Sequence, residues 1–338
     1  MLALDIDGTL VGPDVRLSDR IRAAISEAIA RGVKVSVATG RMPSSAVIFA
    51  ELLGLVEPVI GHQGAVIRAM PEPLRAGSRA GRAGGGSAGG AGGAGGGGKV
   101  REGRIVPFGG RIGKLLHHDP IPADAARDAV RWCRENGLDP HVNHLERIIA
   151  EEDDPRFADY SAYLGRDAEA VTDLLDSIRR PVTKVIAVGE PGRPMALIDD
   201  ARRRFEGRAT ATVSHPRFLE FTALGVTKGH AVAWLAHRAG IPMGRVMAMG
   251  DALNDYEMIV DAGHGAAMAT GPARLRRDAR YIAPPVSQDG AAQLIEALVL
   301  ASPADARRAS ARLEEEARAQ REAPGFDDED HGQGVPVQ

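Results

Sequence analysis

The chain has 338 residues, of which 44% are hydrophobic and 26% are charged, and its formal net charge is −3. This composition is typical of globular proteins, and the length predicts two domains. It excludes a collagen-like chain, and the absence of a long apolar run or a basic excess argues against a membrane protein or a nucleic-acid-binding protein.

The glycines are unevenly distributed. The chain contains 41 glycines, and 13 of them lie in residues 76–98. We predict that this segment is a flexible insert, because it is poor in side chains that could form a core. Its Gly93-(four residues)-Gly98-Lys99 pattern imitates a phosphate-binding loop, but no convincing strand precedes it, and a polyglycine tract matches such patterns by chance.

The first seventy residues predict a strand–helix–strand unit. Residues 2–4 form a short apolar strand, Ser18 is a favourable helix N-cap, and Gly32 stands where a helix ends. Residues 33–38 then predict a buried strand, parallel to the first because the connection contains a helix. Further short strands are expected at 58–60 and 65–67.

The middle of the chain predicts an α+β region. We expect helices at 123–135 and 168–178 and strands at 184–188 and 218–221. Cys133, the only cysteine, is predicted to be buried rather than reactive, and a single cysteine fits a reducing cytoplasm. The histidines His117, His118, His141 and His144 are interpreted as ordinary surface histidines of this region rather than as metal ligands.

Alternating helices and strands return after residue 221. We expect a helix at 228–238, a strand at 246–249, a helix from 254 and a strand at 266–269. The last segment predicts an isolated helix at 304–321 and a disordered acidic end at 327–330. The fold class is therefore α/β, a doubly wound parallel sheet built from both ends of the chain with an α+β domain inserted. Its predicted boundaries are 1–75 (core, first part), 76–98 (insert), 99–221 (inserted domain), 222–302 (core, second part) and 303–338 (helix and tail).

Two polar clusters follow the first two core strands. Asp5 and Asp7 lie two residues apart, so their carboxylates face one point if the chain stays extended. Such a pair suits a nucleophile beside a general acid or base, although a turn or cap explains it equally well. Thr39-Gly40-Arg41 offers a hydroxyl and free backbone N–H groups to an anion, or simply begins a helix.

Two further clusters lie in the second part of the core. Lys228 begins a helix, where a positive charge opposes the helix dipole, and this placement suggests another role for it. Asp251 and Asp255 flank a strand-to-helix turn that also contains Asn254. The two carboxylates are suited to a cation, although as a lone motif a helix cap also explains Asp251 or Asn254. Ligands bind at the carboxyl ends of strands in open α/β sheets, where three of the four clusters lie.

The four clusters in this order resemble the motifs of the haloacid dehalogenase (HAD) superfamily. The 34 positions between Asp5 and Thr39 leave no room for an inserted domain, whereas the 189 positions between Thr39 and Lys228 do. This spacing resembles the Cof-type hydrolases (subfamily IIB). The resemblance implies an HAD-like, Rossmann-like core with an α+β cap domain.

The resemblance also implies a role for each residue. Asp5 would be the nucleophile that forms an aspartyl-phosphate, and Asp7 the general acid and base. Thr39, Gly40 and Asn254 would bind the phosphoryl group, and Lys228 would neutralise its charge. Mg²⁺ would be held by Asp5, the carbonyl group of Asp7 and Asp251, with Asp255 close behind. One departure is Gln63, which stands where the family often has asparagine.

These observations predict a cytoplasmic, Mg²⁺-dependent phosphatase, monomeric or weakly dimeric, that acts on a small phosphate ester. A sugar phosphate and a phosphorylated cofactor are both plausible substrates by resemblance, and neither nucleic acid nor a membrane is an expected partner. Two alternatives stay open: a phosphohexomutase-like transferase and a catalytically inactive HAD-like binding module. The intact clusters argue against the second.

Overall fold

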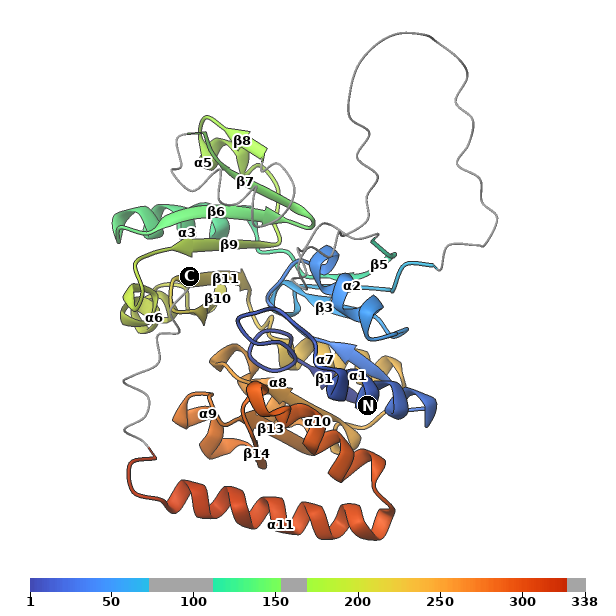
Figure 1. Ribbon diagram of the computed structural model, residues 1–338. Coiled ribbons are helices and arrows are strands. Elements are labelled where there is room, and N and C mark those ends of the chain that lie inside the picture. The colour runs from blue at the N-terminus through green and yellow to red at the C-terminus, as the bar shows by residue number, and fades with distance from the viewer. Residues whose placement is uncertain (73–111, 153–168, 327–338) are drawn as a thin grey trace, which may run out of the picture.

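The computed structural model describes residues 1–72, 112–152 and 169–326 (Figure 1). The glycine-rich insert at 76–98 and the acidic end at 327–330 lie outside these described residues. Within them, no helix has both the length and the apolar character that crossing a membrane would require.

The core is a five-stranded parallel sheet assembled from both ends of the sequence. Strand β1 lies at position four of the order and pairs with β2 on one side and β12 on the other. The sheet thus has the predicted doubly wound arrangement. Its strands in spatial order are β14 (Tyr281–Ala283), β13 (His264–Met268), β12 (Met247–Gly250), β1 (Leu2–Leu4) and β2 (Val35–Val37).

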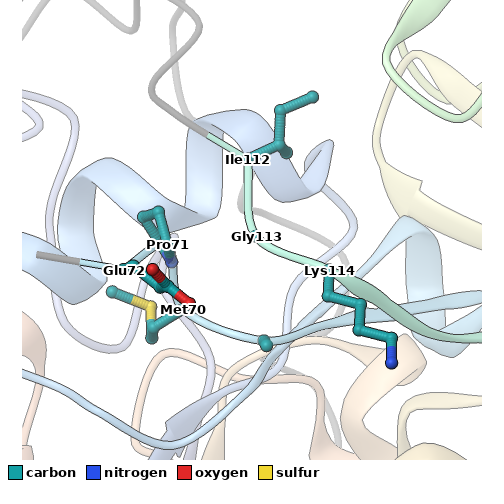
Figure 2. Close-up of a pocket in the computed structure, with 7 residues that line it drawn as sticks. Met70, Pro71, Glu72, Ile112, Gly113 and Lys114 are labelled. Atoms are coloured by element: carbon teal, nitrogen blue, oxygen red, sulfur yellow. The ribbon is translucent and has the colours of Figure 1, made fainter.

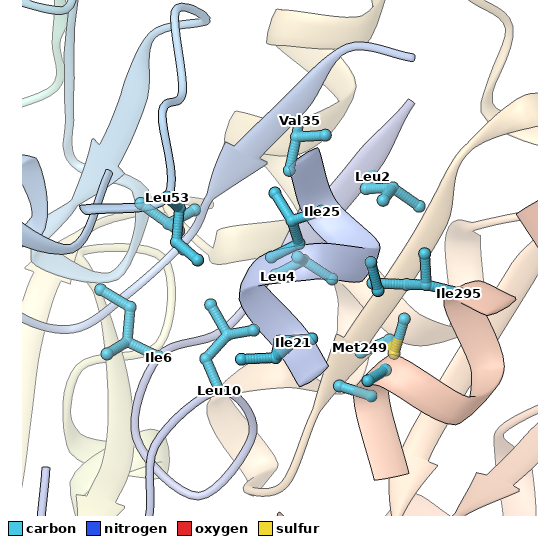
Figure 3. Close-up of a cluster of buried hydrophobic side chains, with 14 of the residues drawn as sticks. Leu2, Leu4, Ile6, Leu10, Ile21, Ile25, Val35, Leu53, Met249 and Ile295 are labelled. Carbon is cyan, nitrogen blue, oxygen red and sulfur yellow. The ribbon is translucent and has the colours of Figure 1, made fainter. Parts of the chain in front are cut away.

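Helices cover both faces of this sheet. Leu2 and Leu4 point to one face, and Ala3 points to the other, because side chains alternate along a strand. Figure 3 shows Leu2 and Leu4 packed with Ile21, Ile25 and Met249. The first face is covered by α1 (Asp19–Ala30), α2 (Pro43–Leu52) and α10 (Gly290–Ile295), and the second by α7 (Lys228–Arg238), α8 (Tyr256–Asp261) and α9 (Ala273–Asp278).

The ends of α1 follow from its sequence as predicted. The backbone N–H of Ile21 donates to the Ser18 hydroxyl at 3.1 Å, which satisfies one N–H group of the first turn. Gly32 has a φ of 79°, a conformation that favours glycine and that ends the helix. The chain then enters β2 directly.

A small antiparallel sheet lies beside the core. It consists of β3 (Val59–Gly61), β4 (Val66–Arg68) and β5 (Leu115–His118), with a 3-10 turn over His62–Gly64 between β3 and β4. An isolated parallel bridge from Ala38 to Ile60 joins it to the end of β2. A cavity of about 580 Å³ lies between Ala69–Glu72 and Ile112–Lys114 (Figure 2), and none of the predicted site residues lines it.

The inserted domain is a six-stranded sheet covered by helices on one face. Trp132 and Phe221 meet edge to face in its core, and burial raises the pKa of the neighbouring Cys133 thiol, as expected of a structural cysteine. The strands in spatial order are β10 (Ala209–His215), β11 (Phe218–Ala223), β9 (Lys184–Val188), β6 (Asp139–His144), β7 (Arg147–Glu151) and β8 (Glu169–Val171), and the packed helices are α3 (Ala123–Glu135) and α6 (Arg193–Arg204).

The helix predicted over 168–178 is wrong for its first half. Residues 169–171 form strand β8, which pairs in parallel with β7 at the edge of the sheet. The helical part is only α5 (Leu174–Ser177), which begins where Asp173 accepts a hydrogen bond from the N–H of Leu175. Pairing with a neighbouring strand therefore overrides the apolar spacing of this segment.

The final helix, α11 (Pro303–Glu322), is present as predicted but is not isolated. Ala317 is buried against the core together with Phe326, and the guanidinium of Arg276 lies 4.5 Å from the centre of the Phe326 ring. The remaining short elements are η2 (Met243–Arg245), η3 (Leu253–Asp255), η4 (Val286–Gln288) and η5 (Glu296–Leu300). The domain boundaries given above stay predictions.

Candidate active site

A buried lysine joins the two parts of the core. Lys228 is the first residue of α7, and its side chain is 1% exposed. Its ammonium group donates to Asp5 Oδ1 at 2.7 Å and to Asp255 Oδ1 at 2.6 Å. These two carboxylates raise the pKa of Lys228 although burial alone would lower it. The positive charge at the start of α7, unfavourable for the helix itself, therefore belongs to a buried ionic cluster.

Asp255 also holds the loop that follows β12. Its second carboxylate oxygen, Oδ2, accepts hydrogen bonds from the N–H groups of Asp251 and Ala252, both at 3.0 Å. Gly250 must be a glycine here, because a Cβ atom at this position would lie 2.4 Å from the side chain of Asp255. Asp255 thus fixes the backbone from which the side chain of Asp251 projects.

Three carboxylates meet above the strand ends. One oxygen from each of Asp5, Asp251 and Asp255 lies within 4.8 Å of the other two. The pKa of Asp5 is raised to about 7, mainly by burial and also by the charges of Asp255 and Asp7, while the charge of Lys228 opposes the rise. Burial and the charge of Asp5 likewise raise the pKa of Asp251. Oxygen ligands under such mutual repulsion fit a divalent cation.

The turn after β1 approaches Asp251 closely. Gly8 has a φ of 79°, and a Cβ atom on it would lie 2.0 Å from Asp251 Oδ2. Glycine is therefore required at this position for two reasons, the backbone conformation and the contact. The Asp5–Gly8 segment and the Asp251 loop are thereby brought together from opposite ends of the sequence.

Asp7 does not point into this cluster. Its side chain is 52% exposed and forms a two-pronged ion pair with Arg41, in which Arg41 Nε donates to Asp7 Oδ2 at 2.7 Å. The chain turns after Asp7, where the N–H of Gly8 donates to the carbonyl of Val11. The chain is therefore not extended here, and the side chains of Asp5 and Asp7 do not point toward one spot. The carboxylate of Asp7 binds the guanidinium of Arg41 instead.

The predicted phosphate-binding residues lie on two neighbouring loops. The side chain of Thr39 is buried, and its hydroxyl accepts a hydrogen bond from the N–H of Arg41 at 3.2 Å. The amide nitrogen of Asn254 donates to Gln63 Oε1 at 2.8 Å. A Cβ atom on Gly40 would lie 2.5 Å from Gln63 Nε2, so Gln63 lies between the loops of Gly40 and Asn254.

Sequence reasoning assigned no role to several residues that line this region. Arg41 was part of a quoted motif, but its pairing with Asp7 depends on the turn after β1. Lys184 lies beside Gly40 and is one of only five lysines in the chain, a scarcity that is a usable signal. Gln63 was singled out only as a departure from the family pattern, and its contact with Glu220 depends on the fold.

Comparison with known proteins identifies the family of this chain. The sequence model of the haloacid dehalogenase-like hydrolases matches residues 2–75 and 103–295. The chain therefore belongs to the haloacid dehalogenase-like hydrolases, which confirms the resemblance to the Cof-type group and the expectation of a hydrolase.

Individual relatives are distant but cover most of both chains. An HMP-PP phosphatase from Serratia proteamaculans is 27% identical over 82% of this chain and 86% of its own. The 5-amino-6-(5-phospho-D-ribitylamino)uracil phosphatase YcsE of Bacillus subtilis is 27% identical over 89% of this chain and 96% of its own. A haloacid dehalogenase-like hydrolase structure from Bacteroides thetaiotaomicron superposes with a TM-score of 0.64 at 23% identity, covering 87% of this chain and 97% of the other. At 23% identity, this structural similarity shows a shared fold alone.

The raised pKa of Asp5 predicts a stability difference that depends on pH. Between pH 3.8 and about 7 the folded chain keeps a proton on Asp5 that the unfolded chain has released. Unfolding free energy is therefore lost as the pH rises through this window. The variant Asp5→Asn lacks this proton. In EDTA, its unfolding free energy relative to the wild type should rise from pH 4.5 to pH 7, by at most about 1.4 kcal/mol per pH unit.

Urea unfolding at several pH values measures this difference. The matched control is Asp14→Asn, which makes the same replacement at an exposed carboxylate outside the cluster. A flat or falling curve for Asp5→Asn would show that Asp5 is ionised throughout.

Proposed function

We propose that the protein is a Mg²⁺-dependent phosphatase that hydrolyses a small phosphorylated metabolite through an aspartyl-phosphate on Asp5. The observation that supports this most strongly is the buried Lys228 ammonium, which holds Asp5 at 2.7 Å beside Asp251. A carboxylate fixed in this way is oriented as a nucleophile, and the lysine offers positive charge to the phosphoryl group.

The proposed first step transfers the phosphoryl group to Asp5. The free oxygen of Asp5 forms a bond to phosphorus while the bond between phosphorus and the leaving oxygen breaks, and Asp7 donates a proton to that oxygen. In the second step Asp7 takes a proton from water, the water oxygen attacks phosphorus, and inorganic phosphate leaves while Asp5 is regenerated. Thr39, Gly40 and Asn254 would hold the phosphoryl oxygens through their hydroxyl, N–H and amide groups.

Arg41 has to be considered in both steps, because it holds the carboxylate of Asp7. The proton-transfer role of Asp7 requires that this carboxylate turn from Arg41 toward the leaving oxygen. Half of the Asp7 side chain is exposed, so the rotation is not obstructed by core packing. Arg41 would then be a positioning residue that holds the Asp7 side chain beside the site between turnovers.

The carboxylate cluster is the proposed site for Mg²⁺. Asp5, Asp251 and the carbonyl group of Asp7 would hold the ion, with Asp255 behind them. When bound, Mg²⁺ neutralises charge on the phosphoryl oxygens and on the carboxylates themselves. Burial and neighbouring carboxylates raise the pKa values of both Asp5 and Asp251, and this cost of holding buried negative charge is the physical reason to expect a cation here.

The proposed substrate class is a small phosphate ester, either a sugar phosphate or a phosphorylated cofactor. The relatives support this class, since one is named for HMP-PP and another for a phosphorylated ribitylaminouracil. As a cap domain, the inserted sheet would select the leaving group. The cytoplasmic location and the monomeric or weakly dimeric state stay predictions from the sequence.

Asp5→Asn should abolish turnover and leave the fold intact, because the amide is a far weaker nucleophile than the carboxylate. We expect kcat with p-nitrophenyl phosphate to fall at least about a hundredfold. Removal of a single hydrogen-bond donor to a transition state already costs about this much in other enzymes. Circular dichroism checks the fold, and Asp14→Asn serves as the exposed control. Near-native activity of Asp5→Asn would show that the nucleophile is another residue.

Mg²⁺ should bind the folded chain and support turnover. At about a hundred times its Kd, the ion should raise the unfolding free energy by about 2.7 kcal/mol, and EDTA should remove both the stabilisation and the activity. Asp251→Asn should lose the stabilisation, whereas Asp261→Asn, at the exposed end of α8, should keep it. Full activity in EDTA, or equal stabilisation of both variants by Mg²⁺, would contradict the proposed ligand set.

A further inference from the structure

A second buried ion pair lies on the cap, against the phosphate-binding loops. Lys184 on β9 and Glu220 on β11 form it, with 2.5 Å between Lys184 Nζ and Glu220 Oε2, and each side chain is 3% exposed. Their strand neighbours Val185, Leu219 and Phe221 belong to the cap core under the helices. Because side chains alternate along a strand, the ion pair lies on the opposite face of the cap sheet, toward the core domain.

Two hydrogen bonds cross from this pair to the core domain. Lys184 Nζ donates to the carbonyl oxygen of Gly40 at 3.0 Å, and Gln63 Nε2 donates to Glu220 Oε1 at 2.9 Å. The hydroxyl of Ser214 also donates to Glu220. The carboxylate therefore has three donors. Burial alone would raise its pKa, but Lys184 and these hydrogen bonds hold the pKa of Glu220 below its ordinary value.

Gln63 connects the cap to both loops that carry the proposed phosphate ligands. Its backbone N–H donates to the Thr39 carbonyl at 3.1 Å, and its side-chain oxygen accepts from Asn254 at 2.8 Å. Gln63 has a φ of 60°, a left-handed conformation that is unfavourable for a residue with a side chain. Such a conformation persists where surrounding contacts enforce it, and functional sites are a common place for it.

Lys184 also acts on Thr39 through a single peptide unit. The Gly40 carbonyl that accepts from Lys184 and the Arg41 N–H that donates to the Thr39 hydroxyl belong to the same planar peptide. Fixing the carbonyl therefore fixes the direction of this N–H. Thr39, Gly40 and Asn254, the three proposed phosphate ligands, are thus each linked to the cap by one or two hydrogen bonds.

The position of the pair is not explained by stability alone. A buried ion pair contributes little net stability compared with apolar residues of the same size, because both charges lose their hydration. Here the contacts that Lys184 and Glu220 make with the core domain, to Gly40 and Gln63, are at the proposed phosphate site. An ion pair that is hydrogen-bonded to Gly40 and to Gln63 is suited to holding the loops that contain these residues in place.

We propose that Lys184, Glu220 and Gln63 are positioning residues that order the phosphate-binding loops when the cap lies on the core. This inference rests on the proposed function, since it assigns Thr39, Gly40 and Asn254 to phosphate binding. Affinity for the phosphoryl group is then partly a property of cap closure. An open cap leaves the loops without these bonds and binds phosphate more weakly.

The test compares two cap–core ion pairs. Lys184→Met combined with Glu220→Gln removes the positioning pair without leaving one buried charge unpaired. The matched control is Arg68→Met combined with Glu146→Gln, which removes a buried cap–core pair with 3.1 Å between Arg68 Nε and Glu146 Oε1. The control pair has no hydrogen bond to the three proposed ligands among the described residues.

Orthovanadate binding measured by calorimetry is the main readout, because it does not require turnover. We expect the Lys184/Glu220 double variant to bind orthovanadate about tenfold more weakly than the wild type, as expected of misplaced ligands, and the control to stay within about twofold. Gln63→Leu should resemble the first variant, since it removes the links to Asn254 and Glu220. Melting temperatures should fall by similar amounts in the two double variants.

The outcomes separate this inference from the proposed function. Equal orthovanadate affinity in the two double variants overturns the positioning role, even if the wild type is an active phosphatase. A selective loss of affinity supports the role, even if the wild type turns over no phosphate ester, in which case the proposed function fails by itself. A wild type that binds neither orthovanadate nor inorganic phosphate contradicts both.

Discussion

The site depends on the double ion pair that Lys228 forms with Asp5 and Asp255. Lys228 is completely enclosed, and removal of either carboxylate would leave a buried charge without full compensation. The pair joins the first strand to the last third of the chain and orients Asp5. Since Asp255 also binds the backbone of the loop carrying Asp251, one ammonium group organises both sides of the carboxylate cluster.

The rest of the architecture brings distant parts of the sequence to this point. The parallel sheet aligns the carboxyl ends of β1, β2 and β12, so the loops after them converge. The cap sheet then places Lys184 and Glu220 over the loop of Gly40. The buried ion pairs thus form two layers, one in the core domain and one in the cap. The lower layer, formed by the ion pairs of Lys228, holds Asp5, which we propose is the nucleophile. The upper layer, the pair of Lys184 and Glu220, holds the backbone that we propose binds phosphate.

The core sheet was predictable because its strands depend on local patterns, and the carboxylate cluster was predictable because parallel strand ends converge and the order of the motifs resembles a known family. Short apolar runs that end in polar residues predicted the core strands. The positions of Asp5 and Asp251 at the ends of two such strands predicted that both belong to the site. Contacts that depend on packing between distant segments were not predictable. The bond between Gln63 and Glu220 spans 157 positions, and the pairing of β8 with β7 overrides the local helical spacing. The pairing of Asp7 with Arg41 depends on the turn after β1, which the sequence left open as an alternative to an extended chain.

The central claim is that Asp5 accepts the phosphoryl group, and trapping the intermediate tests it most directly. The wild type is mixed with substrate and Mg²⁺, quenched in acid within milliseconds and reduced with borohydride, which converts an acyl phosphate on aspartate to homoserine. Peptide mass spectrometry then locates the modified residue. The account predicts homoserine at position 5. A modified residue at any other position, or none during rapid release of phosphate, would contradict it.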